Sequence, residues 1–552
     1  MPLISHSHFR QTGVGRQPGL LMAFVLLVCS AIVLRLAWLQ LLHGQEHRAM
    51  ADENRIRLIP RDPIRGRLLD HTGQVLATNR LTYRLYYQPR LTQERLWPSL
   101  RDRLSGLLGI PAEQLEMQRR LHKGDDDGFH VPLTGPLTPL QVLRFREQAS
   151  SMPGAEVSID VLRSYPNGNL AAHVIGYTSN LTEEEYSRLK EKGYRLSDRI
   201  GRTGLERTYE SHLRGEWGGQ QLEVNAAGRV QRVLGDKPAR PGRDLRLTID
   251  LNLQRAAERA LNTVAKGAIV ALDPQTGAIL AIASRPTFDP NVFANGPTTA
   301  QWNDLNRPQA PMLNRAFQAF PPASYGSIGF EKALAVSSNS FYYLMGLKVG
   351  PDELFKAARR MGYGSHTGVE IVDEESAGLL GDPAWKKKVI GEPWNSVDTI
   401  TSAIGQGAVT VTPIQMARLY AAVANGGWLV TPHLVERPMP RRWLGLRPET
   451  LRVLREGLRM VVTEGTAKIL NDSTLPPVAG KTGTGEDPPR PDHAWFGGYA
   501  PAGKPNLVIV AFGENSGGYG GTVAAPMVKI MMEAWFHPPA GSNSGEAAPR
   551  TP

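Results

Sequence analysis

The sequence predicts an α+β fold that follows a single membrane-spanning helix near the N-terminus. Three observations carry this prediction. One strongly apolar run, interrupted by Arg35 near its far end, occupies residues 19–42. Short strand-like runs alternate with charged helical runs over residues 50–240, and from about residue 245 helices are gathered between early and late strands. A sheet built from strands at both ends of its segment, with helices between them, is typical of the α+β class.

Composition and short motifs argue against nucleic-acid binding, metal binding and an intrachain disulfide, but they do not identify the function. The chain has 552 residues, enough for several domains, and a formal net charge of +11. A basic chain suits anionic lipid, an anionic polymer or nucleic acid, but the sequence has no basic-aromatic array and no nucleic-acid-binding motif. His6 and His8 form an isolated pair without zinc-ligand spacing, and Cys29 is the single cysteine. We therefore expect no nucleic acid, no metal and no intrachain disulfide.

The apolar run GLLMAFVLLVCSAIVLRLAWLQLL, residues 19–42, predicts a transmembrane anchor. A helix of this length spans about 36 Å, and a bilayer core is roughly 30 Å thick. Arg10 and Arg16 precede the run, so residues 1–18 are expected in the cytoplasm and the remainder outside. The alternative is a cleaved signal peptide with a cleavage site at residues 49–51, but polar residues separate that site from the apolar run.

Residues 50–240 predict a mixed α/β domain. The run RGRLLDHTGQVLATNRLTYRLYY contains two strands joined by a turn at Asp70–Gly73, which is typical of a hairpin. GPLTPLQVLRFREQASSMPG and NLTEEEYSRLKEKGY are helical, each with a threonine as the expected N-cap.

Residues 245–537 predict a second, α+β domain with an antiparallel sheet flanked by helices. KGAIVALDPQTGAILAIAS reads as a hairpin, and HAWFGGYAP and PNLVIVAFGEN are strands expected to pair. The best-marked helix has Thr412 as N-cap, Pro413 as first residue and Gly426 as C-cap. Residues 538–552 are expected to form a disordered tail.

Three short groups could carry chemistry. Ser324 follows Pro-Pro-Ala, Ser337 and Asn339 form a Ser-x-Asn group, and residues 481–484 read Lys-Thr-Gly-Thr at the end of a strand. An ammonium, two hydroxyls and a glycine on one strand suit the binding of a carboxylate beside an acyl centre. Each group alone is weak, because Lys-Thr-Gly is a three-residue match and Ser-x-Asn is also an ordinary helix cap.

Together, in this order, the groups resemble the S-x-x-K, S-x-N and K-T-G set of the penicillin-recognising serine acyl transferases. GLERTYESHLRGEWGG, GAIVALDPQTGAILAIAS, LNRAFQAFPPAS, TSAIGQGAVTVTPIQMARLYAAVANGG and AGKTGTGE resemble a class B penicillin-binding protein. RGRLLDHTGQVLATN and SYPNGNLAAHVIGY resemble the pedestal (dimerisation) domain of that family. The likeness extends from about residue 50 to 537 and is greatest to the elongation type, penicillin-binding protein 2.

The resemblance implies a D,D-transpeptidase that cross-links peptidoglycan in cell elongation and that β-lactams inhibit. Ser324 would be the nucleophile, acylated by the penultimate D-Ala of a stem peptide. Ser337 and Asn339 would relay protons and hold the substrate amide, and Lys481 would support the relay. The protein would be a single-pass protein of the bacterial plasma (inner) membrane with its catalytic domain on the periplasmic side.

The resemblance also implies how the substrate binds. The hydroxyls of Thr482 and Thr484 would bind the terminal carboxylate, Gly483 would let the peptide approach the strand, and the N–H groups of Ser324 and Thr484 would form the oxyanion hole. No cofactor or metal is implied. The implied partners are D-Ala-D-Ala stem peptides and β-lactams, the membrane, a SEDS-family glycan polymerase and other proteins of the elongation complex.

One position departs from the family pattern. The family places a lysine, the general base, one helical turn after the nucleophile, and this chain has Ser327 there. A serine cannot take the proton at neutral pH, and loss of a positioned base costs about 10²–10⁴-fold in rate. The intact S-x-x-K at Ser187–Lys190 lies in a charged helix of the pedestal, and Lys332 is eight residues from Ser324.

The spacing departs as well. Only twelve residues separate Ser324 from Ser337, where the family has several dozen, so FPPAS and YGSIGF read as two ends of a junction. Four alternatives stay open. An internal segment is missing from this sequence, the protein is an inactive anchored scaffold, another base serves Ser324, or the chain is an anchored β-lactam sensor or β-lactamase.

Overall fold

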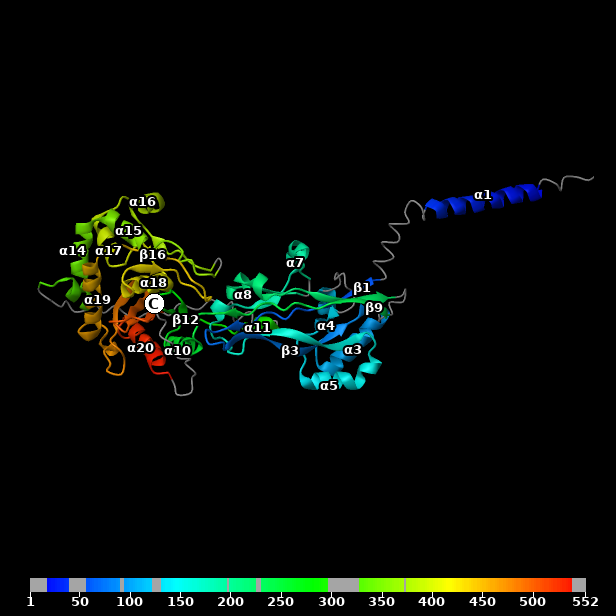
Figure 1. The fold of residues 1–552 in the computed structure, drawn as a ribbon, viewed down its shortest axis with the longest axis horizontal. Helices are drawn as coiled ribbons and strands as arrows, with labels where there is room; N and C mark the ends of the chain where they lie inside the picture. Colours follow the sequence, from blue (N-terminus) through cyan, green and yellow to red (C-terminus); the bar gives the residue numbers. More distant parts are fainter. Residues whose placement is uncertain are drawn as a thin grey trace, which may run out of the picture. The chain divides into compact units, whose positions relative to one another are not determined.

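The computed structural model describes residues 17–38, 56–89, 94–121, 131–195, 198–224, 230–295, 327–371 and 374–538 (Figure 1). The chain divides into two compact units, residues 1–63 with 216–240 and residues 64–215 with 241–552. Ser324, residues 1–16 and residues 539–552 lie outside the described part. The expectation of a disordered tail therefore stays a prediction.

The first unit contains a helix and a three-stranded antiparallel sheet. Helix α1 (Gln17–Ala37) covers most of the predicted anchor. In the described part of the chain, no helix is both long and apolar enough to cross a membrane. The sheet has the order β1-β8-β9, with bounds Ile56–Arg61, Gly218–Val224 and Val230–Lys237.

The pedestal part of the second unit is built on a long antiparallel pair. β3 (Val75–Tyr87) pairs with β5 (Ala155–Ser164) along ten residues, and three short strands extend the sheet: β2 (Leu68–Leu69), β4 (Val131–Pro132) and β10 (Leu245–Arg246). The predicted hairpin around Asp70–Gly73 is confirmed, because β2 and β3 pair antiparallel across it.

Helices close the apolar side of this sheet. Leu85 and Tyr87 of β3 are buried against α3 (Trp97–Leu108), α4 (Ala112–Leu121) and α5 (Pro139–Gln148). The predicted threonine caps are confirmed, because Thr138 of α5 and Thr182 of α7 (Glu183–Leu189) each form a capping box. The smaller elements of the pedestal are α6 (Ala172–Ile175), β6 (Thr178–Asn180), β7 (Arg199–Gly201), α8 (Gly204–Thr208) and α9 (Glu210–Leu213).

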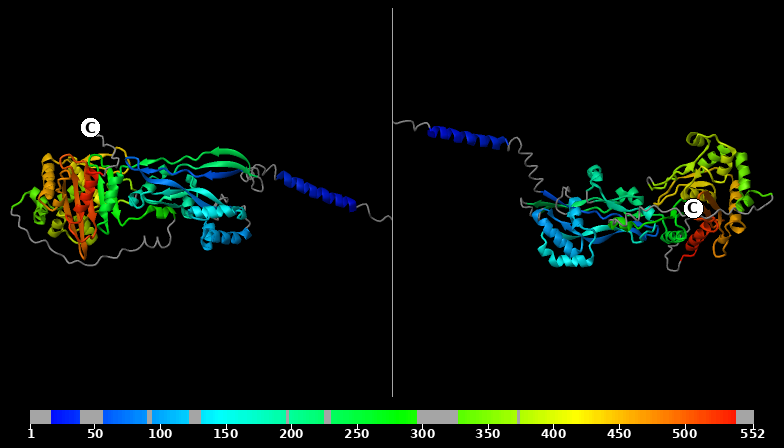
Figure 2. Two further views of the ribbon diagram at one scale, coloured as in Figure 1. Left: turned by 90° about the horizontal axis from the view of Figure 1, so that it is seen from below. Right: turned by 180° about the vertical axis from the view of Figure 1, so that it is seen from behind.

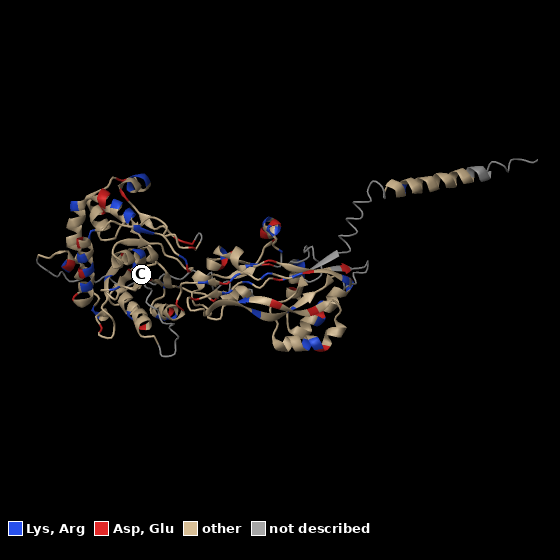
Figure 3. Ribbon diagram, in the orientation of Figure 1, with Lys and Arg blue, Asp and Glu red and all other residues tan. Residues whose placement is uncertain are grey.

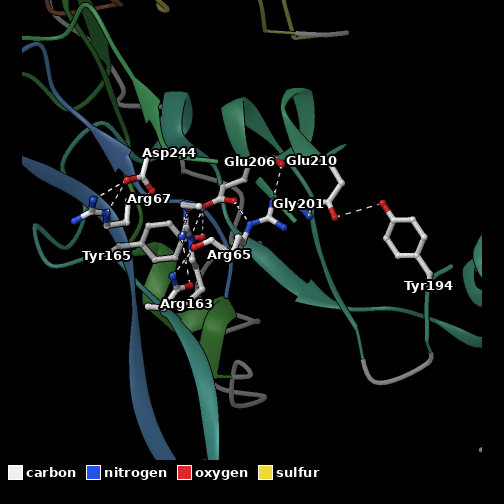
Figure 4. Close-up of polar contacts among 11 residues, drawn as sticks. Arg65, Arg67, Arg163, Tyr165, Tyr194, Gly201, Glu206, Glu210 and Asp244 are labelled. Atoms are coloured by element: carbon white, nitrogen blue, oxygen red, sulfur yellow. Dashed lines mark hydrogen bonds and ion pairs between the residues drawn. The ribbon is translucent and has the colours of Figure 1, made fainter. Parts of the chain in front are cut away.

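A buried charge network fixes α8 to the sheet (Figure 4). The Glu206 carboxylate is fully buried and lies 2.7 Å from Arg65 Nε and 2.6 Å from Arg163 Nε. Arg65 also pairs with Glu210 at 2.7 Å, and Arg163 Nη1 donates to the Gly66 carbonyl at 2.8 Å. Burial favours the neutral acid, but the two guanidinium groups outweigh it and lower the pKa of Glu206.

The transpeptidase-like part contains a five-stranded antiparallel sheet in the order β12-β11-β19-β18-β17. Its strands are β11 (Gly267–Leu272), β12 (Ile279–Arg285), β17 (Ala479–Asp487), β18 (Arg490–Ala500) and β19 (Leu507–Gly513). Figure 2 shows the green strands beside the orange and red ones, so the sheet joins both ends of the segment as predicted. The α+β class is confirmed.

Helices cover both faces of this sheet because alternate strand residues point to opposite sides. Ile269 and Ile509 join the core with α10 (Leu251–Leu261) and α20 (Ala524–Phe536). Val270 and Val510 join the other core, which contains α18 (Pro413–Ala424). Thr412 and Pro413 begin α18 as predicted, but Asn425 is its C-cap; Gly426 follows with φ +92°, so the predicted cap is one residue off.

Further helices complete the second unit; α11 lies against the pedestal strands β5 and β6, and the others lie around the core of the five-stranded sheet (Figure 1). They are α11 (Pro290–Asn295), α13 (Phe330–Ala335), α14 (Asn339–Val349), α15 (Pro351–Arg360), α16 (Pro383–Trp385), η6 (Lys386–Ile390), α17 (Ser396–Ala403) and α19 (Pro448–Thr463). Two short strand pairs complete the fold: β13 (Leu379–Leu380) with β14 (Val409–Thr410), and β15 (Trp428–Val430) with β16 (Arg441–Trp443).

Candidate active site

Lys481 lies on the last strand of the sheet. β17 pairs with β18 on one side, and no strand within the described residues pairs with its other side. Lys481 Nζ donates to Ser337 Oγ at 2.8 Å and to the Thr482 carbonyl at 2.6 Å. Burial lowers the pKa of Lys481 to about 8. An ammonium poised near neutral pH can exchange protons with a hydroxyl beside it.

Ser337 is presented by a strained turn rather than by a helix cap. It has φ +55°, the left-handed region that costs a residue with a Cβ roughly 1 kcal/mol. Ser338, not Ser337, caps α14, because its hydroxyl accepts from the N–H of Phe341. The exposed Ser337 hydroxyl is therefore free of a capping role and is turned to Lys481. Strain retained at such a position is typical of functional sites.

Close packing of α13 on α19 holds this turn in place. A Cβ at Gly457 would lie 2.7 Å from Leu334 Cδ1, and a Cβ at Gly465 would lie 2.1 Å from the Ala335 carbonyl oxygen. Glycine at both positions lets the two backbones approach. The end of α13 is thereby fixed beside β17.

The other residues of β17 have partners of their own. Thr482 is buried, and its Oγ1 lies 2.5 Å from Thr466 Oγ1, next to the end of α19. The Thr484 carbonyl accepts from Gln406 Nε2 at 3.3 Å. Gly483 meets the backbone of Gly520, since a Cβ on Gly520 would lie 2.6 Å from the Gly483 carbonyl oxygen.

The structure thus joins some of the predicted site residues. Ser337 and Lys481, 144 residues apart in sequence, meet, and Asn339 is exposed at the first turn of α14. Ser324 is not among the described residues. Sequence reasoning missed Gln406 and Thr466, although Gln406 lies in the quoted run TSAIGQGAVT; Thr466 had no signal, because a lone threonine after a helix is common.

Lys332, the lysine eight residues after Ser324, is engaged in an ion pair. Its ammonium lies 2.9 Å from Glu464 Oε2 in an exposed ion pair.

Helix α14 is apolar but poorly covered. Its sequence is NSFYYLMGLKV, yet Gly346 is its only buried residue. Leu344 is 64% exposed, Leu347 49% and Val349 53%. A helix this apolar normally packs on a neighbour along most of its length. In the described part of the chain, no helix or strand covers the face of α14 that carries Leu344, Leu347 and Val349.

Known families match the chain over both folded parts. The family described as Penicillin-binding Protein dimerisation domain matches residues 60–247, and the Penicillin binding protein transpeptidase domain matches residues 267–326 and 320–533. A peptidoglycan D,D-transpeptidase MrdA from Haemophilus influenzae is 31% identical over 93% of this chain and 90% of the relative. The chain belongs to the class B penicillin-binding proteins of the elongation type. The predicted family is confirmed.

Further relatives agree. The MrdA transpeptidase of Acinetobacter baumannii is 30% identical to this penicillin-binding protein over 93% of the chain and 86% of the relative. A chain from a solved peptidoglycan synthase complex has a TM-score of 0.66 and 32% identity, covering 95% of this chain and 98% of that one. PBP2 of Helicobacter pylori, solved in complex with MreC, has a TM-score of 0.76 at 24% identity, covering 87% and 99%; this likeness shows the fold alone.

The comparisons also bear on the junction at Ser324. The Haemophilus alignment has 595 positions, but 93% of the 552-residue penicillin-binding protein is about 513 residues, so about 80 positions of the relative face no residue here. The transpeptidase family matches in two pieces that overlap at residues 320–326. The match is therefore interrupted where the sequence predicts a junction.

The lowered pKa of Lys481 predicts a pH-dependent stability. Between pH 8 and about 10.5 the unfolded chain binds more protons than the folded one, so the free energy of unfolding rises with pH across this window. Lys481→Met removes the cost of burying the charge. We expect the variant to melt roughly 2–4 °C above the parent at pH 7 and level with it near pH 10.5.

Thermal unfolding followed by circular dichroism between pH 7 and 10.5 measures this difference. Lys332→Met, which removes an exposed ammonium, is the matched control. A Lys481→Met variant that melts below the parent at pH 7 would show that the lysine stabilises the fold.

Proposed function

We propose that this penicillin-binding protein is a membrane-anchored peptidoglycan D,D-transpeptidase of the elongation machinery. One observation carries the proposal: Lys481 Nζ and Ser337 Oγ, from two motifs far apart in sequence, meet at 2.8 Å beside an edge strand. The MrdA relatives bear the name of this activity. An edge strand offers an extended peptide a row of backbone hydrogen-bonding groups.

In this proposal Ser324 Oγ attacks the carbonyl carbon of the penultimate D-Ala and the terminal D-Ala leaves as the free amine, which receives a proton. An acceptor amine then attacks the acyl-enzyme, forms the cross-link and releases Ser324. Ser337 and Lys481 pass the protons, and Asn339 holds the substrate amide. The N–H groups of Ser324 and Thr484 stabilise the oxyanion.

The terminal carboxylate of the peptide would bind to the second half of the site. Thr482 and Thr484 supply hydroxyls and Gly483 leaves room at the strand. Because the Thr482 hydroxyl already meets that of Thr466, it would act as one end of a hydroxyl pair. The buried ammonium of Lys481 adds a positive charge that favours a carboxylate.

The missing base limits the rate of this chain. Ser327 occupies the position of the family lysine, and Lys332 is engaged with Glu464. We propose that an internal segment containing the lysine and the following helix is absent from this sequence. The break in the family match and the uncovered face of α14 support this reading. The alternative is an inactive scaffold that keeps its place in the cell-wall complex.

Location, domains and partners belong to the same proposal. Residues 19–42 would anchor the chain in the plasma membrane with residues 1–18 in the cytoplasm, residues 50–240 would form the pedestal, and residues 245–537 the transpeptidase domain. The partners would be a glycan polymerase and other elongation proteins, because related chains were solved in a peptidoglycan synthase complex and with MreC. Membrane fractionation with and without residues 19–42 tests the anchor.

Peptide binding tests the site without requiring catalysis. We expect a pentapeptide ending in D-Ala-D-Ala to bind the purified full chain, and Lys481→Met to weaken binding about tenfold or more, because a charge-assisted contact is lost. Lys332→Met is the control and should bind as the parent does. Calorimetry measures both. Equal binding by parent and Lys481→Met would refute the proposed site.

A further inference from the structure

The β15–β16 hairpin presents a basic and aromatic surface. Arg441 and Arg442 are exposed, and Trp443 is 47% exposed. Figure 3 shows Lys and Arg positions on α15 and β16, with acidic positions at the start of α15. This surface is distinct from the Lys481 site, since it lies on a separate strand pair that follows α18.

The aromatic part of the surface is held in a fixed position. The rings of Trp428 and Trp443 pack at 5.3 Å between centroids, and Arg441 Cζ lies 4.6 Å from the centroid of Trp428. A Cβ at Gly427, which has φ +110°, would lie 2.8 Å from Trp443 Cζ3, so the ring of Trp443 rests on the Gly427 backbone. A preformed, half-exposed aromatic ring loses little conformational freedom when it binds a ligand.

The charges around the hairpin are not neutralised. Among the described residues, none of the four guanidinium groups here has a carboxylate within 4.0 Å; they belong to Arg360, Arg418, Arg441 and Arg442. Three of them donate to backbone carbonyls instead: Arg360 to Leu444, Arg442 to Arg360 at 2.8 Å, and Arg418 to Val430 at 2.6 Å.

The one acid that acts on Arg418, Glu375, has backbone partners of its own. Glu375 attracts Arg418, but its carboxylate accepts from the N–H groups of Thr367 and Gly368. Burial and the positive charge of Arg442 both lower the pKa of Arg418, as expected where like charges gather. A cluster of arginines that bond only to backbone keeps its attraction for an external anion.

We propose that the β15–β16 hairpin binds a carboxylate-bearing glycan strand of peptidoglycan. Trp443 packs against the apolar C–H face of a sugar ring, and Arg441 and Arg442 pair with carboxylates of the stem peptides. This inference rests on the proposed function, which brings the chain to peptidoglycan, and adds a second contact outside the acyl-transfer site. A flat aromatic ring with flanking guanidinium groups suits a polysaccharide better than a phospholipid surface, which offers no ring to stack.

Co-sedimentation of the full chain with purified sacculi tests the proposal. We compare the parent with Trp443→Ala and with Arg441→Gln/Arg442→Gln. The control is Arg188→Gln/Lys190→Gln, which removes the same charge from the exposed end of α7 in the pedestal. We expect each hairpin variant to bind sacculi about five- to tenfold more weakly than the parent. Binding by the double arginine variant should depend much less on salt concentration, and the control should match the parent.

Two parallel measurements separate the possible failures. In one arm, vesicles rich in anionic phospholipid replace the sacculi. The glycan assignment would be overturned if the parent bound these vesicles and the arginine variant lost vesicle binding but still bound sacculi. Equal sacculus binding by parent and hairpin variants, or none by the parent, would overturn it too. Pentapeptide binding is measured on the same samples. If the parent does not bind the pentapeptide, but sacculus binding still depends on the hairpin, the result counts against the proposed function alone.

Discussion

Fluorescent penicillin is expected to acylate the purified chain about 10²–10⁴-fold more slowly than it acylates a family member with a complete S-x-x-K group. In the proposed mechanism Ser324 attacks the β-lactam carbonyl, and a proton must leave the serine hydroxyl as the bond forms. Ser327 cannot accept that proton at neutral pH, and Lys332 is ion-paired with Glu464. In the proposed mechanism Lys481, which contacts Ser337, serves the relay rather than the first proton transfer.

The second-order rate of labelling, followed by gel fluorescence and intact mass, measures this effect. Ser324→Ala defines the background. A chimera that receives the segment of the Haemophilus relative between Ser324 and Tyr325 is the positive control and should label at the rate of the relative. Labelling of the unaltered chain at that rate would contradict the argument, because it would require a base that neither Ser327 nor Lys332 supplies.

The same chimera tests the interpretation of α14. If the face around Leu344 and Leu347 belongs to the core of the complete domain, the inserted helix covers it and the protein gains stability. Burial of one large apolar side chain contributes about 1.5–3 kcal/mol. In that case α14 is apolar because it packs against this helix in the complete domain, and it is exposed here because the helix is missing from the sequence.

Local patterns in the sequence predicted much of the fold because they act over a few residues. Thr138, Thr182 and Thr412 were assigned as caps from their spacing alone, and each closes a capping box in the structure. The end of α18 was placed one residue late because Asn425 and Gly426 both suit a helix terminus.

Contacts across long stretches of chain were harder to predict. The resemblance placed Ser337 and Lys481 in one site, and the structure shows the contact, but the Thr482–Thr466 pair depends on how α19 packs beside β17. Glu206 gave no signal either, because a glutamate in GLERTYESHL reads as an ordinary helical residue until the sheet brings two arginines to it. Tertiary packing, not local propensity, sets both.

Glu206→Gln is expected to destabilise the second unit by about 3–5 kcal/mol, the cost of leaving buried charges without their partner. Arg163 loses its carboxylate altogether, and Arg65 keeps only Glu210. Glutamine matches glutamate in shape, so packing is preserved and the change isolates the charge. The melting temperature should fall by about 3–5 °C, because the unfolding entropy of a unit of this size is about 1 kcal/mol/K.

The control for this change is Glu184→Gln, which removes one end of an exposed ion pair with Arg188 on α7. Exposed pairs contribute about 0–1 kcal/mol, so this variant should melt within about 2 °C of the parent. Equal melting temperatures for Glu206→Gln and Glu184→Gln would mean that water reaches the network and screens it.

Acid titration separates charge from shape in the Glu206 variant. Because the pKa of Glu206 is lowered in the folded chain, its contribution to stability is complete above the pKa of an unfolded glutamate, about 4.3, and is lost as the pH falls through the folded-state value. The melting temperatures of parent and Glu206→Gln should therefore differ most at pH 6–7 and converge below pH 4. A difference that stayed constant down to pH 3 would assign the effect to packing. Convergence would show that the ionised carboxylate between Arg65 and Arg163 holds α8 on the pedestal sheet.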